Sequence, residues 1–416
     1  MTGLVLARRL DTRDAVAVGL GAMLGAGIFS APAPAARSAG AWLPLAVLVA
    51  GFVAWCNATS SASLAAVMPQ AGGTYVYAGR MLGPGWGHLA GWGFVTGKTA
   101  SCAAMALTVG AYAWPQRPRL AATIALLLTV ALGTGGVQRG ARLTRVLLAV
   151  VLAVLTLVVV AGVGVQDGRD VAGPVGGPTG VLPAAGLMFF AFAGYARLAT
   201  LGEEVRDPSR VIPRAIAVAL AAALVVYLVV TVAALLALGP ARLAASPAPL
   251  ADVVAARGWH GAVPVVRAGA VAAASGALLS LLLGVSRTAF AMARDGHLPR
   301  TLVVVRSGVP RRAELAVGLV VLGLVWAVDL RAAIGFSSLA VLVYYLLANL
   351  SARRLAPDVG RHPRWVPVAG ALGCAVLALT LPIASVLAGL SVLALGAVVR
   401  VVVQRRRDAL GTPRVR

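Results

Sequence analysis

Lys98 is the only lysine among the 36 Lys and Arg residues of this 416-residue chain. It falls near the middle of an apolar run, residues 86–113, that is long enough to cross a membrane. A charge at that depth costs about 2.5–3.5 kcal/mol on insertion scales, and a desolvated lysine, unlike arginine, can release its proton near neutral pH. We therefore predict proton coupling or substrate contact for Lys98. The alternative, snorkelling to the interface, needs a long reach from mid-span.

Main-chain groups offer a second kind of chemistry. Gly25, Ala26, Gly27 and Ile28 interrupt the apolar run 15–36. Unpaired N–H and C=O groups cost several kcal/mol each in hydrocarbon, so a broken helix persists there only where it lines a cavity or meets a ligand. The interruption is a candidate binding site.

The apolar run 180–202 is interrupted in a similar way around Gly194. It lies five predicted spans after the first interrupted run, which is the spacing expected if two inverted repeats each open with a broken helix. The alternative is that these glycines serve close helix packing, as in GxxxG pairs.

Arg197 follows the second interruption and is a candidate site or gate residue; pairing with Glu203 or Glu204 is the alternative. Two cations without a buried acid disfavour a cationic substrate and favour a neutral or acidic one. The predicted spans carry Asp only at their ends, at Asp329 and Asp295, so we expect no proton relay through carboxylates.

The bulk composition indicates an all-α integral membrane protein. Hydrophobic residues make up 60% of the chain, the mean hydropathy is +0.91 and only 12% of residues are charged. No ten-residue apolar/polar alternation typical of a membrane barrel is present.

The loop 68–77 is expected to form a short helix at the membrane surface. We predict spans at 15–36, 41–66, 86–113, 119–134, 143–165, 180–202, 211–238, 261–292, 313–329, 331–352, 366–381 and 383–403; the last pair is the weakest, since a re-entrant hairpin fits it too.

The net charge of +23 raises the question of nucleic-acid binding, but its distribution argues against it. Most Lys and Arg residues fall on one side of the predicted spans, which is the positive-inside pattern. We expect a multi-pass protein of the cytoplasmic membrane with both termini cytoplasmic. The apolar N-terminal run is predicted to be a span rather than a cleaved signal, because further spans follow at once.

Enzyme and metal readings find no support in the sequence. HExxH, GxSxG and GxxxxGK[ST] motifs are absent. Cys56, Cys102 and Cys374 are far apart within apolar runs, which predicts packing rather than disulfides or a metal site. We expect no catalytic residues, no metal and no cofactor, with a proton or Na⁺ as the only candidate coupling ion.

Five segments, residues 21–29, 68–75, 189–195, 203–208 and 286–299, are similar in order and spacing to motifs of amino acid permeases. The chain thereby resembles the amino acid-polyamine-organocation (APC) superfamily. The resemblance implies a LeuT-like 5+5 inverted repeat with two extra C-terminal helices and alternating access around a central site. The whole chain, 1–416, is then one transporter domain, with repeats at 15–165 and 180–352 and the extra helices at 366–403.

The resemblance also implies a substrate site. N–H groups at the first break would receive a carboxylate, carbonyls at both breaks would accept an ammonium, and an aromatic ring of the second break would cover the substrate. Relatives often carry an acid after that aromatic, where Ala196 and Arg197 stand here, and an amine in the fifth span, where this chain has none. The implied residues are Gly25, Ala26, Gly27, Ile28, Phe190, Ala191, Phe192, Ala193 and Tyr195.

Together these observations predict a secondary transporter for a small amino acid, neutral rather than cationic, working by proton symport or exchange. Its partners would be that substrate and membrane lipid, with no nucleic acid. The alternatives are a transporter-like amino acid sensor, a polyamine or amine carrier, and a channel.

Overall fold

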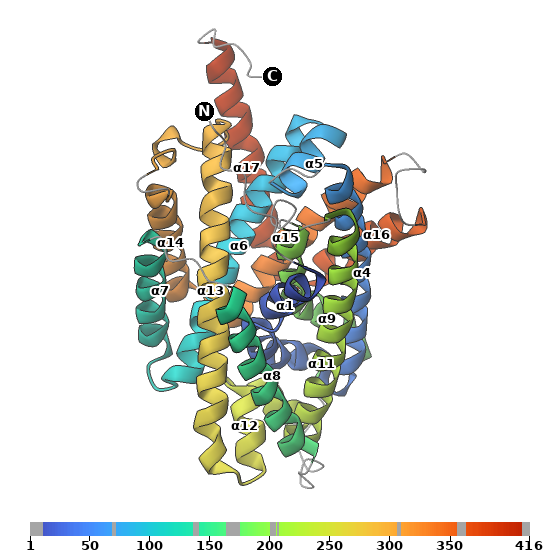
Figure 1. Ribbon diagram of the computed structural model, residues 1–416, viewed down its shortest axis with the longest axis vertical. Helices are drawn as coiled ribbons and strands as arrows, with labels where there is room; N and C mark the ends of the chain where they lie inside the picture. The colour runs from blue at the N-terminus through green and yellow to red at the C-terminus, as the bar shows by residue number, and fades with distance from the viewer. Residues whose placement is uncertain are drawn as a thin grey trace.

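The computed structural model describes residues 11–68, 72–135, 141–163, 175–199, 205, 208–305, 309–355 and 363–409. Over this part the chain is helical and contains no β-strand, which confirms the predicted class (Figure 1). Each of the twelve predicted segments contains helix. The longer helices are α1 Thr12–Met23, α4 Leu43–Val67, α6 Pro84–Ala113, α7 Pro118–Thr134, α8 Ala141–Val163, α9 Val181–Phe192, α11 Pro208–Ala245, α13 Val263–Arg294, α14 Arg311–Ala327, α15 Leu330–Arg353, α16 Trp365–Thr380 and α17 Ile383–Ala409.

Eight helical segments of the described chain are long and apolar enough to cross a membrane, and α7 and α16 are shorter apolar helices. The helices gather around α1, which is seen nearly end-on at the centre of Figure 1. There α6 packs along both α13 and α15, and α11 packs against α1 and α4. The number of spans remains a prediction.

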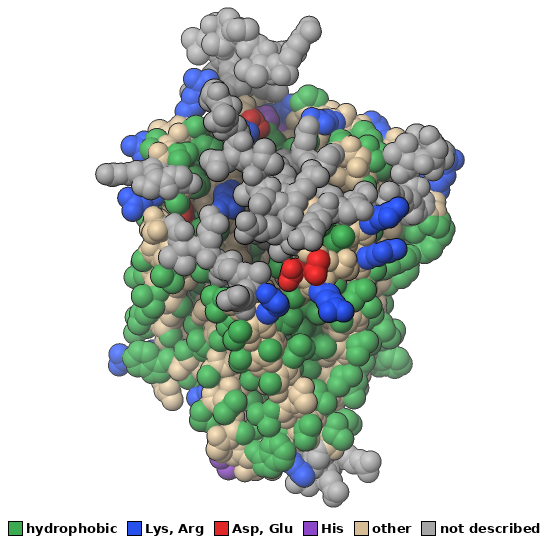
Figure 2. Space-filling view, viewed as in Figure 1, with side chains coloured by type: hydrophobic (Ala, Val, Ile, Leu, Met, Phe, Trp, Pro, Cys, Tyr) green, Lys and Arg blue, Asp and Glu red, His purple; other side chains and the backbone are tan. Residues whose placement is uncertain are grey.

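The outer surface matches a lipid environment. Figure 2 shows hydrophobic side chains over the middle and lower part of the molecule, with Lys and Arg gathered toward the upper end. The large apolar residues Leu319, Leu379 and Ile383 are 71%, 70% and 71% exposed, respectively. Such exposure would be unfavourable in water, and it fits helices that face hydrocarbon.

The helix α11 extends seven residues past the predicted span end at 238 and contains a kink. Gly239 has φ 67° and ψ 167° inside it, and Pro240 follows. Glycine tolerates this positive φ, and proline has no N–H to continue the helical ladder. Beyond the kink lies the short helix α12, Pro249–Ala256, which periodicity did not predict.

The predicted short helix in the loop after the second span exists as α5, Thr74–Met81; residues 69–71 of the loop lie outside the described part. It ties two distant parts of the chain together. The Tyr75 hydroxyl donates to Asp295 Oδ2 at 2.8 Å and lies 3.0 Å from His297 Nδ1. Burial, together with the Asp295 carboxylate, raises the pKa of Tyr75, so this hydroxyl remains a donor. The Thr74 N–H donates to the Tyr344 hydroxyl at 2.9 Å, which links α5 to α15.

Candidate functional site at the two helix breaks

The first predicted break is present in the backbone. The helix α1 ends at Met23; Leu24 has φ −76° and ψ 28°, and Gly25 has φ −81° and ψ −136°, outside the helical region. The chain resumes as α2, Ala26–Ser30, and continues through Ala31, whose backbone is right-handed helical, into α3, Pro32–Ala39. The first-turn N–H groups of α2 have no partner within the helix, and they carry the positive end of its dipole.

The second break is milder than predicted. The helix α9 ends at Phe192, a 3₁₀ turn covers Ala193–Tyr195, and α10 spans Ala196–Ala199. Ala193 and Ala196 keep right-handed dihedrals, at φ −61°, ψ −3° and φ −52°, ψ −29°. The chain therefore tightens here rather than unwinds.

The two breaks lie against each other. A Cβ added at Gly27 would stand 2.5 Å from the Cα of Ala191, and one added at Gly25 would stand 2.8 Å from the Cβ of Ala277 on α13. Side chains do not approach to such distances, so glycine is what lets the backbones of α2 and α9 touch. In this conformation the space between Gly27 and Ala191 is filled by the two backbones themselves.

Lys98 reaches the second break from α6. Its Nζ donates to the Ala193 carbonyl at 3.4 Å, and the residue is 6% exposed. No carboxylate of the described residues forms an ion pair with it. The ammonium therefore points toward the break, which does not fit snorkelling to a membrane interface.

Tyr227 of α11, which the sequence analysis did not identify, touches both breaks. Its hydroxyl lies 2.6 Å from the carbonyl oxygen of Met23, at the end of α1, and 3.0 Å from that of Ala191 in α9. Its ring packs edge-on against Phe192, with centroids 4.8 Å apart. A signal existed, because Tyr227 is the one hydroxyl-bearing aromatic residue within the predicted span 211–238.

A second buried tyrosine holds only the first broken helix. The Tyr112 hydroxyl donates to the Phe29 carbonyl at 3.0 Å and accepts from the Leu250 N–H at 3.3 Å. Ser30 donates to the Ala26 carbonyl at 2.8 Å. The carbonyl oxygens of Ala191 and Ala193, which were candidates for the ammonium site, and that of Phe29 beside it each accept a hydrogen bond from a side chain in this structure.

The three aromatic residues proposed to cover a substrate differ in their surroundings. Phe192 packs on Tyr227, and Tyr195 is fully buried and stacks on Tyr345 with centroids 5.1 Å apart. Both rings are therefore held in the interior. Phe190 keeps 7% exposure, so it is the ring best placed to meet a ligand. The side chain of Arg197 and residues Glu203 and Glu204 lie outside the described part.

The expectation that the predicted spans carry acidic residues only at their ends is wrong. Glu314 lies inside the predicted span 313–329 and was overlooked; it is fully buried near the start of α14. Both of its carboxylate oxygens lack a hydrogen-bond partner, and they crowd Gly133 of α7. Glu314 forms no ion pair with Lys98 among the described residues.

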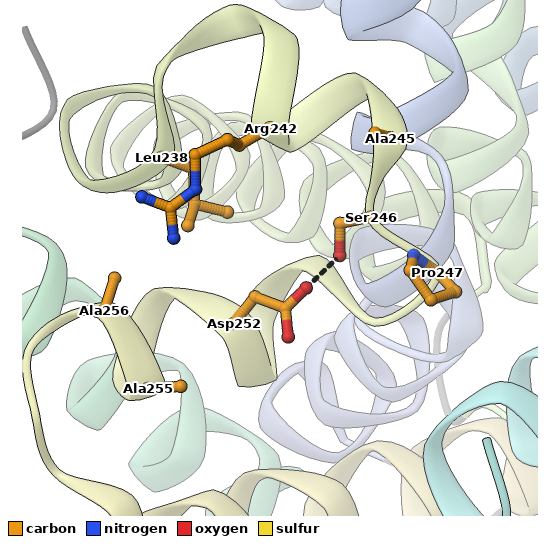
Figure 3. A pocket seen from close by; sticks show the side chains of 8 residues that line it. All are labelled: Leu238, Arg242, Ala245, Ser246, Pro247, Asp252, Ala255 and Ala256. Atoms are coloured by element: carbon orange, nitrogen blue, oxygen red, sulfur yellow. Dashed lines mark hydrogen bonds between the residues drawn. The ribbon is translucent and has the colours of Figure 1, made fainter. Parts of the chain in front are cut away.

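A separate open pocket of about 460 Å³ lies where α11 meets α12. Figure 3 shows Arg242 and Asp252 facing it, with Ser246 donating to Asp252 at 2.5 Å. None of its lining residues is among the predicted site residues. The pocket is therefore distinct from the two breaks.

Comparisons with known proteins cover nearly the whole chain. The family model described as amino acid permease matches residues 14–408. The chain is 56% identical over 412 residues, 97% of its length and 94% of the relative's, to an uncharacterized transporter of Mycobacterium tuberculosis. It is 30% identical to a vacuolar cationic amino acid transporter of Arabidopsis thaliana, covering 85% of this chain and 61% of that one. It is 26% identical to the methylthioribose transporter of Bacillus subtilis, covering 87% and 85%.

Proposed function

We propose, from the premise that the chain belongs to the amino acid permease family, that it carries a small neutral amino acid by alternating access around its two broken helices. The chain is a multi-pass membrane protein and a transporter rather than an enzyme. The substrate class, the coupling and the mechanism are the proposal.

The contact between the two breaks is the observation that carries it. Gly25 to Gly27 present N–H groups at the start of a helical run, which suits a carboxylate, and the C-terminal ends of α1 and α9 present carbonyls, which suit an ammonium. Helix ends of opposite polarity placed side by side match the two charges of a zwitterion.

Charge at the breaks supports a neutral substrate side chain. Lys98 adds a buried cation beside Ala193, and no described acid faces it. A second cation on the substrate would be repelled in this low-dielectric setting. The Arabidopsis relative is named for cationic substrates, so a cationic amino acid or a polyamine is the second candidate.

The close packing at the two breaks supports a small substrate. The backbones of Gly27 and Ala191 touch, and Gly25 lies against Ala277. A substrate must separate these surfaces to enter, and each added side-chain atom requires a wider separation in a densely packed interior. Glycine, alanine and serine are the matching candidates.

Coupling is proposed to run through Lys98, as proton symport or proton-linked exchange. A buried lysine can lose its proton, whereas the protein's arginines cannot. Among the described residues its hydrogen-bond partner is the Ala193 carbonyl, one of the oxygens proposed to receive the substrate ammonium. Substrate and protonated lysine would therefore compete for one acceptor, which favours proton-linked exchange over symport.

We further propose a cytoplasmic-membrane location with both termini cytoplasmic, supported by the gathering of Lys and Arg toward one end (Figure 2). The proposed repeats run from α1 to α8 and from α9 to α15, with α16 and α17 as the two extra helices.

The test begins with purified protein and a thermal-shift panel of small neutral amino acids, arginine, lysine and polyamines. A ligand that prefers the folded state raises the melting temperature. Stabilisation by glycine, alanine or serine supports the proposal, and stabilisation by polyamines or cationic amino acids alone contradicts it.

The stabilising compound is then used in counterflow with proteoliposomes, and protein-free liposomes serve as the control. A carrier exchanges internal for external labelled substrate. Binding without exchange indicates a sensor, and flux without trans-stimulation indicates a channel; either result contradicts carriage by alternating access.

A further inference from the structure

We propose that Tyr227 is a positioning residue that couples the two broken helices, so that the end of α1 and the end of α9 move together. Its hydroxyl lies 2.6 Å from the Met23 oxygen and 3.0 Å from the Ala191 oxygen. Met23 belongs to the first proposed repeat and Ala191 to the second, and Tyr227 itself comes from a third helix, α11.

Both carbonyls are helix-end acceptors. Met23 is the last residue of α1 and Ala191 is the next to last of α9, and the last four carbonyls of a helix have no donor within it. Tyr227 is fully buried, so its hydroxyl has no exposure to bulk water. A single donor therefore serves two acceptors from two separate helices.

The hydroxyl carries one proton, which it gives mainly to the nearer oxygen, that of Met23, while the Ala191 oxygen remains close enough to take it instead. Moving either helix end away would leave at least one buried carbonyl without its donor, at a cost of about 1–3 kcal/mol. Moving both ends together with Tyr227 avoids that cost. The contact thus favours joint movement over separate movement.

The ring contributes rigidity, because it packs edge-on against Phe192 at 4.8 Å. Phe192 is the last residue of α9. Phenylalanine at position 227 would keep this packing and remove only the proton. Tyr227→Phe is therefore a specific test of the coupling, and Tyr112→Phe is its matched control, since Tyr112 is equally buried and donates only to Phe29 of the first broken helix.

Hydrogen exchange of the purified protein decides the point without any assumption about transport. In Tyr227→Phe we expect peptides covering 18–25 and 190–196 to exchange about 2- to 10-fold faster, as loss of one hydrogen bond implies. In Tyr112→Phe we expect faster exchange in the 26–34 region and at Leu250, whose N–H loses its acceptor, but not in the 190–196 peptide. Exchange unchanged in Tyr227→Phe, or faster in only one of its two peptides, would overturn the coupling.

Transport provides the second readout, and this arm rests on the proposed function. With the two ends uncoupled, turnover in exchange should fall about 3-fold or more while KM stays within about twofold, because a conformational step and not binding is affected. Both peptides loosened with turnover unchanged would also overturn the proposal. Absence of transport in the wild type refutes the proposed function alone.

Should Tyr227→Phe fail to fold, the wild type still supplies a test. Peptides 18–25 and 190–196 should open as one cooperative unit, with equal opening free energies under native conditions. Clearly different opening free energies for the two peptides would contradict joint movement.

Discussion

The side-chain nitrogen of Lys98 lies 3.4 Å from the carbonyl oxygen of Ala193. The first residue is the chain's only lysine, and the second begins the 3₁₀ turn of the second break. A cation therefore already occupies one of the oxygens that we propose for the substrate ammonium.

Replacing Lys98 should remove the pH dependence of binding. The protonated amine holds the Ala193 carbonyl, so wild-type affinity should rise as pH rises and the amine loses its proton. Lys98→Met should bind at acid pH about 10-fold or more tighter than wild type, the scale of one hydrogen bond to a charged group. The measurement is substrate-dependent thermal stabilisation across the neutral range.

Lys98→Arg is the matched control for this prediction. Arginine stays protonated, so this variant should bind weakly at every pH. A pH profile that is the same in Lys98→Met as in wild type would exclude Lys98 from coupling.

A methyl group at Gly27 should destabilise the protein. The added Cβ would meet the Ala191 Cα at 2.5 Å, and backbone cannot move aside as a flexible side chain can. Gly27→Ala should cost about 1–3 kcal/mol, typical of overpacking. Thermal unfolding in detergent measures it.

Gly284 of α13 provides the control for Gly27. An added Cβ there meets nothing within 4 Å, so Gly284→Ala should be neutral or stabilising by up to about 1 kcal/mol through helix propensity. Equal stability of the two variants would mean that α2 and α9 do not touch as described.

Phe190 should govern substrate affinity. It is the ring among the three candidates that keeps some exposure, whereas Phe192 and Tyr195 are held by Tyr227 and Tyr345. Phe190→Ala should raise KM about 5- to 10-fold, the loss expected when one apolar contact with a ligand is removed. Counterflow kinetics test this.

Phe52→Ala is the comparison for Phe190, since Phe52 on α4 is 49% exposed on the outer surface. Its KM should match wild type. If Phe190→Ala and Phe52→Ala behave alike, Phe190 does not contact the substrate.

A pair of buried asparagines should stabilise the scaffold beside the second break. Asn349 Nδ2 donates to Asn57 Oδ1 at 2.6 Å, joining α15 to α4. Asn57→Ala and Asn349→Ala should each lower the unfolding free energy by about 0.5–1.5 kcal/mol, the net worth of one hydrogen bond, because Asn349 Nδ2 keeps the Tyr345 carbonyl and Asn57 Oδ1 keeps the Cys374 thiol as partners. A double-mutant cycle should give coupling of about 0.5–1.5 kcal/mol; strictly additive effects would contradict a direct bond.

The helical class, the first break and Lys98 could be predicted because each is a local signal. A glycine pair in an apolar run, or one lysine in a span, stands out without knowledge of its neighbours. The helices also fall on the twelve predicted segments, since span length depends on composition along the chain.

Features that depend on distant partners could not be predicted. Nothing local says that Tyr227 meets Met23, or that Tyr195 turns to Tyr345 rather than to a ligand. Glu314 was visible in the sequence inside the predicted span 313–329 and was overlooked. The second interruption was predicted from Gly194, but the sequence did not say that the chain would form a 3₁₀ turn there.

The unequal depth of the two interruptions has a mechanical consequence. Leu24 and Gly25 have left helical geometry, while residues 193–196 still follow a helical path. We therefore expect α2 and α3 to turn relative to α1 about residues 24 and 25, while Tyr227 keeps the ends of α1 and α9 together.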